Sequence, residues 1–278
     1  MQGIILLDKQ INKTSREMIN ELTHIFYTKK IGHTGTLDPI ATGILVVLIG
    51  KYTKLNDLLL SLKKEYIAKI KVGFKTDTLD ITGNIVDQND VLPNKEDVIR
   101  IINGLHGKYQ QKVPMYSAKK VNGKKLYEYA RKGQIVNAPV NEIEIFESEF
   151  ISYEDDIITF KVLVSKGTYI RSLIEKICDD LNILGSMCYL RRTKQGNFSI
   201  DDSVTLNNIK QGKYRLLTAS EVLDYPIYHL NKNEYNKVVN GSKLSLNIDS
   251  EHIILVYDNK EIAIYQKQDD YYKPKIML

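Results

Sequence analysis

Residues 32–39 (GHTGTLDP) are best suited to chemistry, because they place a single carboxylate among glycines. Glycine permits backbone conformations that other residues resist, and it lets a ligand approach the main chain. Pro39 disfavours helical backbone at the residue before it, so Asp38 is expected on an extended or turn segment. A carboxylate fixed in such a loop can act as a nucleophile or a general base. The pattern also suits an Asp that caps a turn before an apolar strand, and both interpretations stay open.

A second polar group occupies residues 165–172 (SKGTYIRS), where a predicted strand runs into a predicted helix. If the backbone stays extended here, the period of two places Tyr169 and Arg171 on the same face. Arg171 could then keep a nearby buried carboxylate in its charged form. It could equally be an ordinary arginine at a helix start, and the spacing does not decide between the two.

Positive charge is concentrated in residues 116–133. The chain has 39 Lys and Arg against 34 Asp and Glu, a net charge of +5. In this segment Glu128 is the only acidic residue, and Tyr116, Tyr127 and Tyr129 lie between basic residues. Such a mixture suits an RNA backbone with bases to stack upon, although a solvated helix face with core tyrosines gives the same pattern. The basic residues are Lys119, Lys120, Lys124, Lys125, Arg131 and Lys132.

The surrounding periodicities predict an α+β fold that positions these segments. Strands are predicted at residues 4–7, 44–48, 66–74, 142–150 and 157–164, and helices at 14–26, 97–105 and 170–181. Thr14 and Glu17 form a capping-box pattern at the first helix start. After residue 225 a short helix and a hairpin follow. We therefore predict a main domain over 1–225, with a basic lobe at about 105–135, and a small domain over 226–278.

Composition excludes several classes of protein. The chain is 43% hydrophobic and 26% charged, as globular proteins are. Its longest uncharged apolar run, at 41–50, is roughly half of what a membrane helix needs. The first residues lack the pattern of a secretory signal, so we expect a cytoplasmic protein. Cys178, Cys188 and five scattered histidines give no four-ligand zinc pattern, so no metal is expected.

Several motifs occur together in an order that is typical of one family. They are GHTGTLDP at 32–39, Tyr66 opening its strand, TDT at 76–78 with Asp80 and Gly83, YSAKKVNGKKLYEYARKG at 116–133, SKGTYIRSL at 165–173 and YLRR at 189–192. In this order they resemble the bacterial tRNA pseudouridine-55 synthases of the TruB family over about residues 3–224. Each motif alone would be weak evidence.

This resemblance implies isomerisation of uridine 55 to pseudouridine in the T-arm of tRNA by base flipping, without a cofactor or a metal. It implies a central mixed, largely antiparallel sheet flanked by helices, followed by a small β-rich, PUA-like RNA-binding domain. A monomer without an obligate protein partner is expected. The implied roles are Asp38 as the catalytic aspartate, Tyr66 stacking on the target base, Tyr169 and Arg171 ordering the site, Leu190 packing beneath the base, and His33 contacting the RNA loop.

The chain departs from the family pattern at a few positions. Gln10 and Asn12 stand where the family's first motif usually has Pro and Gly, and Val113 replaces a usual Pro. Asn tolerates a left-handed backbone, so the turn of the first motif can survive.

Two other functions fit part of the pattern. A catalytically silent relative would keep the RNA surface and act as a tRNA-binding or chaperone protein. A hydrolase of glycosidic bonds would pair Asp38 with a second carboxylate ~5–10 Å away, from Asp77 or Asp80. A Thr-Asp-Thr turn more often serves local hydrogen bonding. The Asp38→Asn variant separates a synthase from a binder, because it removes the reaction alone.

Overall fold

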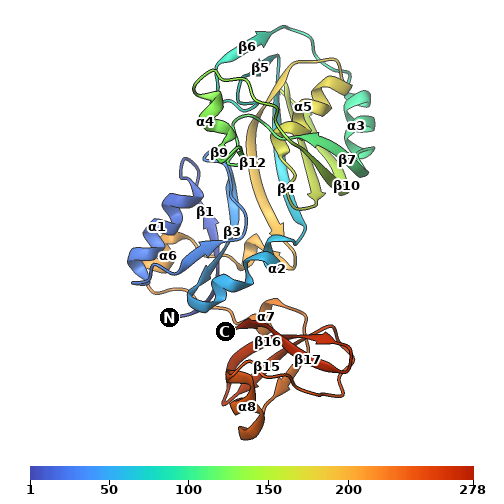
Figure 1. The fold of residues 1–278 in the computed structure, drawn as a ribbon. Coiled ribbons are helices and arrows are strands. Elements are labelled where there is room, and N and C mark those ends of the chain that lie inside the picture. Colours follow the sequence, from blue (N-terminus) through green and yellow to red (C-terminus); the bar gives the residue numbers. More distant parts are fainter.

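The structure is a computed structural model that describes residues 1–278. Two separate sheets form most of it (Figure 1). The larger sheet has nine strands and the smaller has four. Along the larger sheet the order is β1 (Gly3–Lys9), β3 (Thr42–Ile49), β12 (Gly185–Gln195), β4 (Lys64–Val72), β11 (Ile157–Val164), β10 (Val140–Glu154) and β7 (Gly107–Lys112). In addition, β2 (Ile31–His33) pairs with β3, and β13 (Phe198–Ser199) pairs with β12. Within this larger sheet only the β3–β12 pair is parallel. The predicted mixed, largely antiparallel sheet is confirmed.

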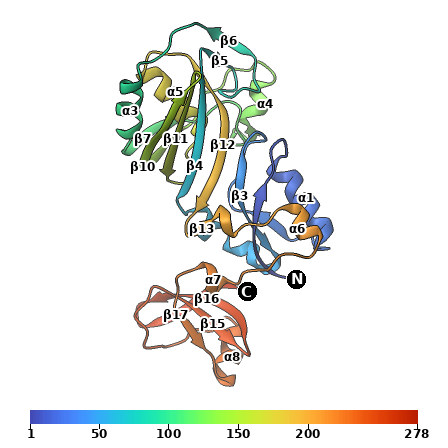
Figure 2. The same ribbon diagram turned by 180° about the vertical axis from the view of Figure 1, so that it is seen from behind.

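Helices cover the two ends of this sheet. At the β1–β3 end, α1 (Ser15–Ile25) and α6 (Leu206–Lys210) share one apolar cluster with the strands. At the other end, α3 (Lys95–Asn103) and α5 (Ile170–Asp180) pack against β4, β10 and β11, as Figure 2 shows from behind. No helix is long and apolar enough to cross a membrane. The shorter elements are η1 (Gly50–Leu55), α2 (Asn56–Leu60), β5 (Phe74–Thr76), β6 (Ile85–Gln88), β8 (Lys120–Val121), β9 (Lys124–Lys125), α4 (Leu126–Ala130), η2 (Ile200–Asp202) and α7 (Ala219–Val222).

Local patterns account for the elements that hold the site. On β4 every second side chain, among them Tyr66, Ala68 and Ile70, is buried against the α5 side of the sheet. The α1 helix begins after Thr14, whose hydroxyl accepts from the Glu17 amide while the Glu17 carboxylate accepts from the Thr14 amide. Both satisfy amide groups that a helix start leaves unpaired. The predicted capping box and the alternating strand are confirmed.

The parallel junction of β3 and β12, termed the seam below, is very short. Its register pairs are Arg191 with Thr42 and Arg192 with Gly43. Gly43 has φ +104°, and a Cβ there would lie 2.2 Å from the Arg192 carbonyl oxygen, so the close approach requires glycine. The buried Arg192 side chain donates from Nε to the Ile44 carbonyl at 2.7 Å and from Nη2 to the Gly35 carbonyl at 3.2 Å. These side-chain hydrogen bonds connect the two halves of the sheet, which are joined by only two β3–β12 register pairs.

The smaller sheet follows in the order β14 (Ile227–His229), β15 (His252–Tyr257), β16 (Lys260–Gln268) and β17 (Tyr271–Met277), with α8 (Lys232–Val239) beside it. Its apolar residues, including Ile264, join a cluster with Tyr52 of η1. The Tyr52 hydroxyl donates to Glu261 at 2.6 Å across the same contact. The strand-rich C-terminal part is confirmed, although β14 and β17 were not among the predicted strands. The boundary at residue 225 stays a prediction.

Candidate active site

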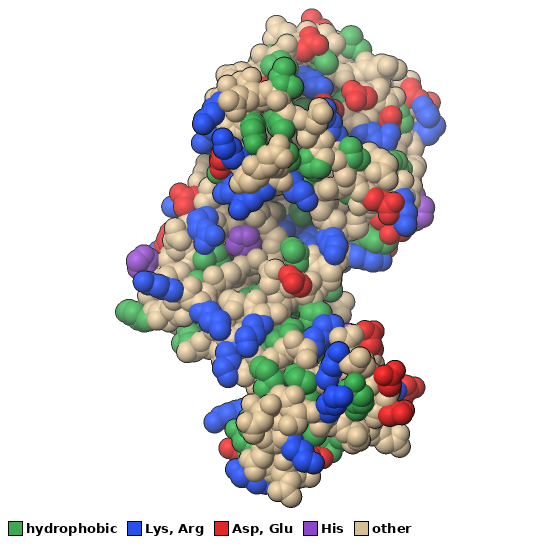
Figure 3. All heavy atoms as spheres, viewed as in Figure 1, with side chains coloured by type: hydrophobic (Ala, Val, Ile, Leu, Met, Phe, Trp, Pro, Cys, Tyr) green, Lys and Arg blue, Asp and Glu red, His purple; other side chains and the backbone are tan.

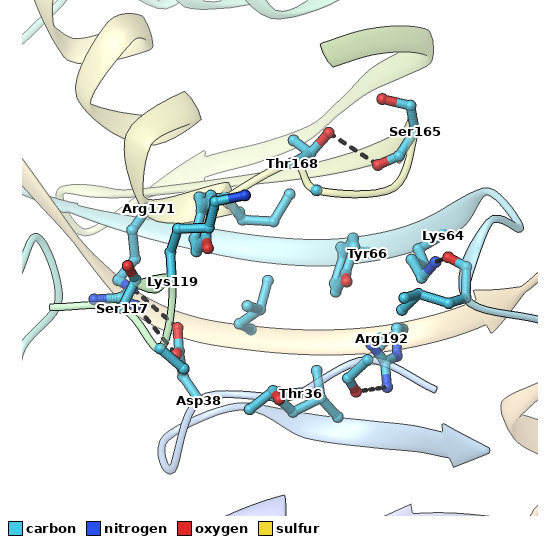
Figure 4. A pocket seen from close by; sticks show the side chains of 18 residues that line it. Thr36, Asp38, Lys64, Tyr66, Ser117, Lys119, Ser165, Thr168, Arg171 and Arg192 are labelled. Atoms are coloured by element: carbon cyan, nitrogen blue, oxygen red, sulfur yellow. Dashed lines mark hydrogen bonds and ion pairs between the residues drawn. The ribbon is translucent and has the colours of Figure 1, made fainter. Parts of the chain in front are cut away.

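A cavity of about 380 Å³ opens where the two halves of the large sheet meet (Figure 4). The 32–39 loop lines it from the β1–β3 side, whereas β4, β12, the start of α5 and the segment before β8 line it from the other. Its volume is in the usual range for small-ligand sites. Asp38 is the only acidic residue in the lining. The structure thus brings together six of the predicted site residues, namely Asp38, Tyr66, Tyr169, Arg171, Leu190 and, from the basic lobe, Lys119.

Asp38 is presented by the loop between β2 and β3. The buried Lys9 side chain at the end of β1 holds the following turn, donating from Nζ to the Ala41 carbonyl at 2.6 Å and to the Pro39 carbonyl at 3.3 Å. The Asn12 amide also donates to the Pro39 carbonyl, at 2.9 Å. Asn12 has φ +61°, so it takes the left-handed backbone that glycine would take. The first-motif turn survives its substitutions and supports the Asp38 loop.

Arg171 contacts both oxygens of the Asp38 carboxylate. Its Nε lies 2.9 Å from Oδ2, and its Nη2 donates to Oδ1 at 3.1 Å. The arginine side chain is only 5% exposed, whereas that of Asp38 is 32% exposed. The remaining donors reach the Thr78 carbonyl at 3.1 Å and the Tyr116 carbonyl at 3.0 Å. This two-point contact fixes the plane of the carboxylate and leaves it open to the cavity.

Of the two interpretations left open for the 165–172 segment, the structure has the helix start, in agreement with the helix predicted over 170–181. The backbone is not extended as far as Arg171, because α5 begins at Ile170 with Tyr169 as its N-cap. Tyr169 is held through its main chain, since Gln111 accepts from its amide at 2.8 Å and donates to its carbonyl at 3.0 Å. Burial raises the pKa of the Tyr169 phenol. Tyr169 and Arg171 therefore reach one cavity through a helix start rather than through strand alternation.

Tyr66 and Leu190 supply the apolar wall opposite the loop. They lie on the neighbouring strands β4 and β12, where Tyr66 is opposite Arg192 and Leu190 is opposite Ala68. Both side chains belong to the core on the α5 side of the sheet, yet both line the cavity. A flat base could lie against this wall while its sugar faces Asp38.

His33 is not part of the cavity lining. It lies on β2 opposite Val47, and its Nδ1 is buried without a hydrogen-bond partner. Burial, together with the nearby Arg192 and Arg16 charges, lowers the pKa of His33 to about 4. The ring is therefore neutral at physiological pH, and its predicted contact with the RNA loop stays a prediction.

The basic lobe projects beside the cavity as β8, β9 and α4 (Figure 1). None of its six predicted basic residues forms an ion pair, and Lys119 reaches the cavity lining. In Figure 3 basic side chains gather over the α4 region and along the hollow below it. Tyr127 already has Lys125 and Arg131 over its ring, 5.4 and 5.3 Å from the ring centre. The lobe thus offers unpaired cations, whereas Tyr127 is engaged within it.

A second carboxylate for hydrolysis is missing from the cavity. Asp80 is buried, accepts from the Thr82 amide at 2.9 Å, and its Oδ2 lies 3.9 Å from Arg171 Nη1. Asp77 accepts from the Asn84 amide at 2.9 Å. These contacts are the local hydrogen bonds expected of such a turn, and no group of three or more His, Cys, Asp or Glu side chains could hold a metal ion.

Reasoning from the sequence missed three basic residues that belong to this site. Lys9 supports the Asp38 loop, and Lys64 and Arg192 line the cavity at the end away from Asp38 (Figure 4). The sequence carried a partial signal, because Lys9 and Arg192 stand in motifs that the family resemblance uses. Lys64 gave none, since it resembles any lysine at a strand start.

Comparisons with known proteins show which family the chain resembles. Residues 23–170 match the model of the TruB family pseudouridylate synthase N-terminal domain. The chain is 39% identical over 267 residues to a protein of Caldanaerobacter subterraneus named tRNA pseudouridine synthase B, covering 95% of this chain and 94% of that one. It is also 39% identical to the protein of the same name from Oceanobacillus iheyensis, covering 99% and 96%.

A solved structure supports the fold alone. The crystal structure of a Cbf5-Nop10-Gar1 complex contains a chain that is 22% identical, with a TM-score of 0.72 over 99% of this chain and 84% of that one. Since the sequence relatives extend over nearly the full length and the family model covers the Asp38 loop, this chain belongs to the TruB family of pseudouridylate synthases.

Proposed function

We propose that this protein isomerises uridine 55 in the T-arm of tRNA to pseudouridine, with Asp38 as the catalytic residue. The observation that carries the proposal is the Asp38 carboxylate, which Arg171 fixes through both oxygens at the mouth of a cavity walled by Tyr66 and Leu190. The relatives named tRNA pseudouridine synthase B support tRNA as the substrate.

The reaction matches a site with a single carboxylate. Pseudouridine forms when the bond from C1′ to N1 breaks, the base turns, and C1′ joins C5, while a proton leaves C5 and one is gained at N1. No atom or electron is gained or lost overall, so one aspartate and an enclosed, aromatic-walled pocket can serve it. Attack of Asp38 on C1′, attack on C6 of the base, and assistance of elimination to a glycal each require this carboxylate next to the bound nucleotide.

The remaining side chains have roles that follow from their positions. Tyr66 offers a ring on which the extruded uracil stacks, and Leu190 packs beneath it. Flipping a nucleotide out of a folded arm costs a few kcal/mol, and stacking on an aromatic ring returns ~1–3 kcal/mol. Contacts from the basic lobe to RNA phosphates supply the rest. We also assign the C5 proton transfer to the Tyr66 phenol, which lies against the base in this arrangement.

The decisive experiment is incubation of unmodified tRNA transcript with the purified protein, followed by mapping of pseudouridine at nucleotide resolution. We expect a single modified site at position 55. Asp38→Asn is expected to abolish the product and to leave tRNA affinity nearly unchanged, because it keeps the shape of the side chain. A wild type that binds the transcript without modifying it would instead identify a tRNA-binding or chaperone protein, and release of free uracil would identify a hydrolase.

Membership of the family also suggests the domain division, the cellular location and the oligomeric state of the protein. Residues 1–225 would form the catalytic domain and 226–278 a PUA-like RNA-binding domain, a division that the separate four-stranded sheet supports. The enzyme would act in the cytoplasm as a monomer without a cofactor. Sedimentation of the protein with and without tRNA tests the oligomeric state, and activity after exhaustive dialysis against a chelator tests the need for a metal.

A further inference from the structure

The cavity has a second chemically distinct end, formed by Lys64 at the start of β4 and Arg192 on β12. Figure 4 shows these two side chains on one side of Tyr66, with Asp38 and Arg171 on the other. Lys64 is 6% exposed and Arg192 is 1% exposed. Neither forms an ion pair, although Arg171 at the opposite end has two carboxylates within reach. Of the three buried basic residues in the cavity, Arg171 therefore has acidic partners, whereas Lys64 and Arg192 have none.

Both cations border a single space beside Gly35. A Cβ built on Gly35 would lie 3.4 Å from Arg192 Nη1 and 3.8 Å from Lys64 Cε. Gly35 has φ +111°, a conformation that side chains rarely adopt, so the loop leaves this space empty of protein. Arg192 Nη1 and the end of the Lys64 side chain thus border the same part of the cavity beside Gly35, with Leu60 Cδ1 also 3.8 Å from the built Cβ.

The known hydrogen bonds do not use all the donors at this place. Arg192 directs Nε and Nη2 to carbonyl oxygens of Ile44 and Gly35, while Nη1 faces the space beside Gly35. Lys64 donates to the carbonyls of Leu60 and Leu62, both at 2.7 Å, which uses two of the three protons of its ammonium group. A purely structural role in capping α2 explains these two bonds. It does not explain why a second buried cation stands next to the first.

Two like charges so close together are unfavourable unless an anion joins them. Burial, together with the Arg192 and Lys166 charges, lowers the pKa of Lys64 to about 8. An arginine cannot relieve the repulsion by losing its proton. An anion with several acceptor oxygens, placed between the two side chains, would satisfy the free donors and remove the repulsion.

We infer that Lys64 and Arg192 form a binding subsite for a backbone phosphate of the RNA, next to the nucleotide whose base lies on Tyr66. This inference rests on the proposed function and deepens it. A nucleotide carries its phosphate on the sugar, so a base on Tyr66 and a sugar at Asp38 bring a phosphodiester into the same cavity. The subsite would position the sugar against the carboxylate, whereas the basic lobe binds the RNA outside.

The test replaces phosphates of the RNA one at a time. A T-arm stem-loop is prepared with a neutral methylphosphonate at each position flanking the target uridine, and its affinity for the wild type is measured. We expect one substitution to weaken binding about tenfold or more, because a hydrogen bond to a charged group contributes at least that much. The Lys64→Met variant should bind the natural RNA about as weakly as the wild type binds the substituted RNA. Its affinity should fall no further when that phosphate is neutralised. The slope of its RNA affinity against salt concentration should be smaller by about one phosphate contact.

Lys194→Met is the matched control, because it removes one positive charge from a residue that pairs with Glu65 outside the cavity. This variant should still lose affinity when the sensitive phosphate is neutralised. Equal losses for wild type and Lys64→Met at every phosphate would overturn the inference. If Lys64→Met does not fold, the phosphate series is measured with the wild type and with Lys64→Arg, which keeps the positive charge. Both proteins should lose affinity at the same phosphate. Unchanged affinity of both proteins for every methylphosphonate RNA would overturn the inference.

The two hypotheses fail in different ways. A wild type that binds and modifies the natural stem-loop, yet tolerates each methylphosphonate, removes the phosphate subsite and leaves the proposed function intact. A wild type that forms no pseudouridine removes the proposed function, whatever the phosphate series shows.

Discussion

Replacement of Arg171 by alanine is expected to lower both the stability and the turnover of the enzyme. The arginine side chain is 5% exposed, contacts Asp38 at 2.9 Å, lies 3.9 Å from Asp80, and donates to two carbonyl groups. Its removal leaves the buried Asp80 without its nearest cation and the two carbonyls without a donor. Breaking a buried pair costs about 3–5 kcal/mol. Since Asp38 is one-third exposed and can recruit water, we expect the lower end, about 3 kcal/mol.

The assay combines urea unfolding with single-turnover formation of pseudouridine in a T-arm stem-loop. Lys176→Ala is a matched control on the same helix, because Lys176 forms an exposed pair with Asp180 at 2.8 Å. Such a surface pair contributes only about 0.3–0.5 kcal/mol. Arg171→Ala should therefore destabilise the protein several times more than Lys176→Ala does, and it should slow the chemical step as well.

A double-mutant cycle isolates the pair itself. Asp38→Asn alone leaves Arg171 without its best acceptor, and the combination Asp38→Asn with Arg171→Met removes both charges. The double variant should be less destabilised than the sum of the Asp38→Asn and Arg171→Met single variants, because the Asp38 charge that Arg171→Met leaves unpaired is then absent, while the loss at Asp80 is common to both arginine variants. Additive losses, or an Arg171→Ala variant that unfolds like the wild type and keeps full activity, would show that the pairing argument is wrong.

Three further outcomes are expected. Lys9→Met removes the donor that holds the Ala41 and Pro39 carbonyls, so single-turnover rates should fall by about 10²-fold while RNA affinity, measured by filter binding, changes little. Burial places the pKa of Lys64 at about 8 instead of 10.5, so the folded state binds fewer protons than the unfolded chain between these values and its stability rises with pH. Urea unfolding from about pH 7.5 to about pH 9.5 should therefore show the wild type gaining stability relative to Lys64→Met, and parallel curves would contradict the burial argument. Tyr66→Phe keeps the stacking ring and loses the phenol, so it should bind RNA like the wild type and form pseudouridine at least about 10²-fold more slowly in a rapid-quench assay.

Much of the fold was predictable because its elements follow local patterns. The alternation along β4, the capping box at Thr14 and the apolar stripe of α5 each depend on residues a few positions apart, which a sequence displays directly. Asp38 could be singled out for the same reason, since its glycines and Pro39 are its neighbours. Local spacing could not decide whether Asp38 is a catalytic aspartate or an aspartate that caps a turn.

The remaining features depend on contacts between distant residues. Arg171 meets Asp38 across 133 positions of the chain, and Arg192 meets Ile44 across 148. At Tyr169 and Arg171 local spacing left an extended backbone and a helix start both open, and the structure has the helix start, as the helix predicted over 170–181 implies. The burial of Lys64 could not be predicted, because it is decided by α2 and β12 rather than by its neighbours in sequence.

Because of the seam between β3 and β12, the activity of the enzyme should depend closely on correct pairing of the two halves of the sheet. The reactive carboxylate arrives from one flank of this joint, whereas the guanidinium and the ring that receive the substrate arrive from the other. A chain that has folded on one flank only therefore lacks the complete proposed site. Since a displacement of ~1 Å can slow an oriented reaction by about 10²-fold, loosening of the joint would silence the protein well before it melts.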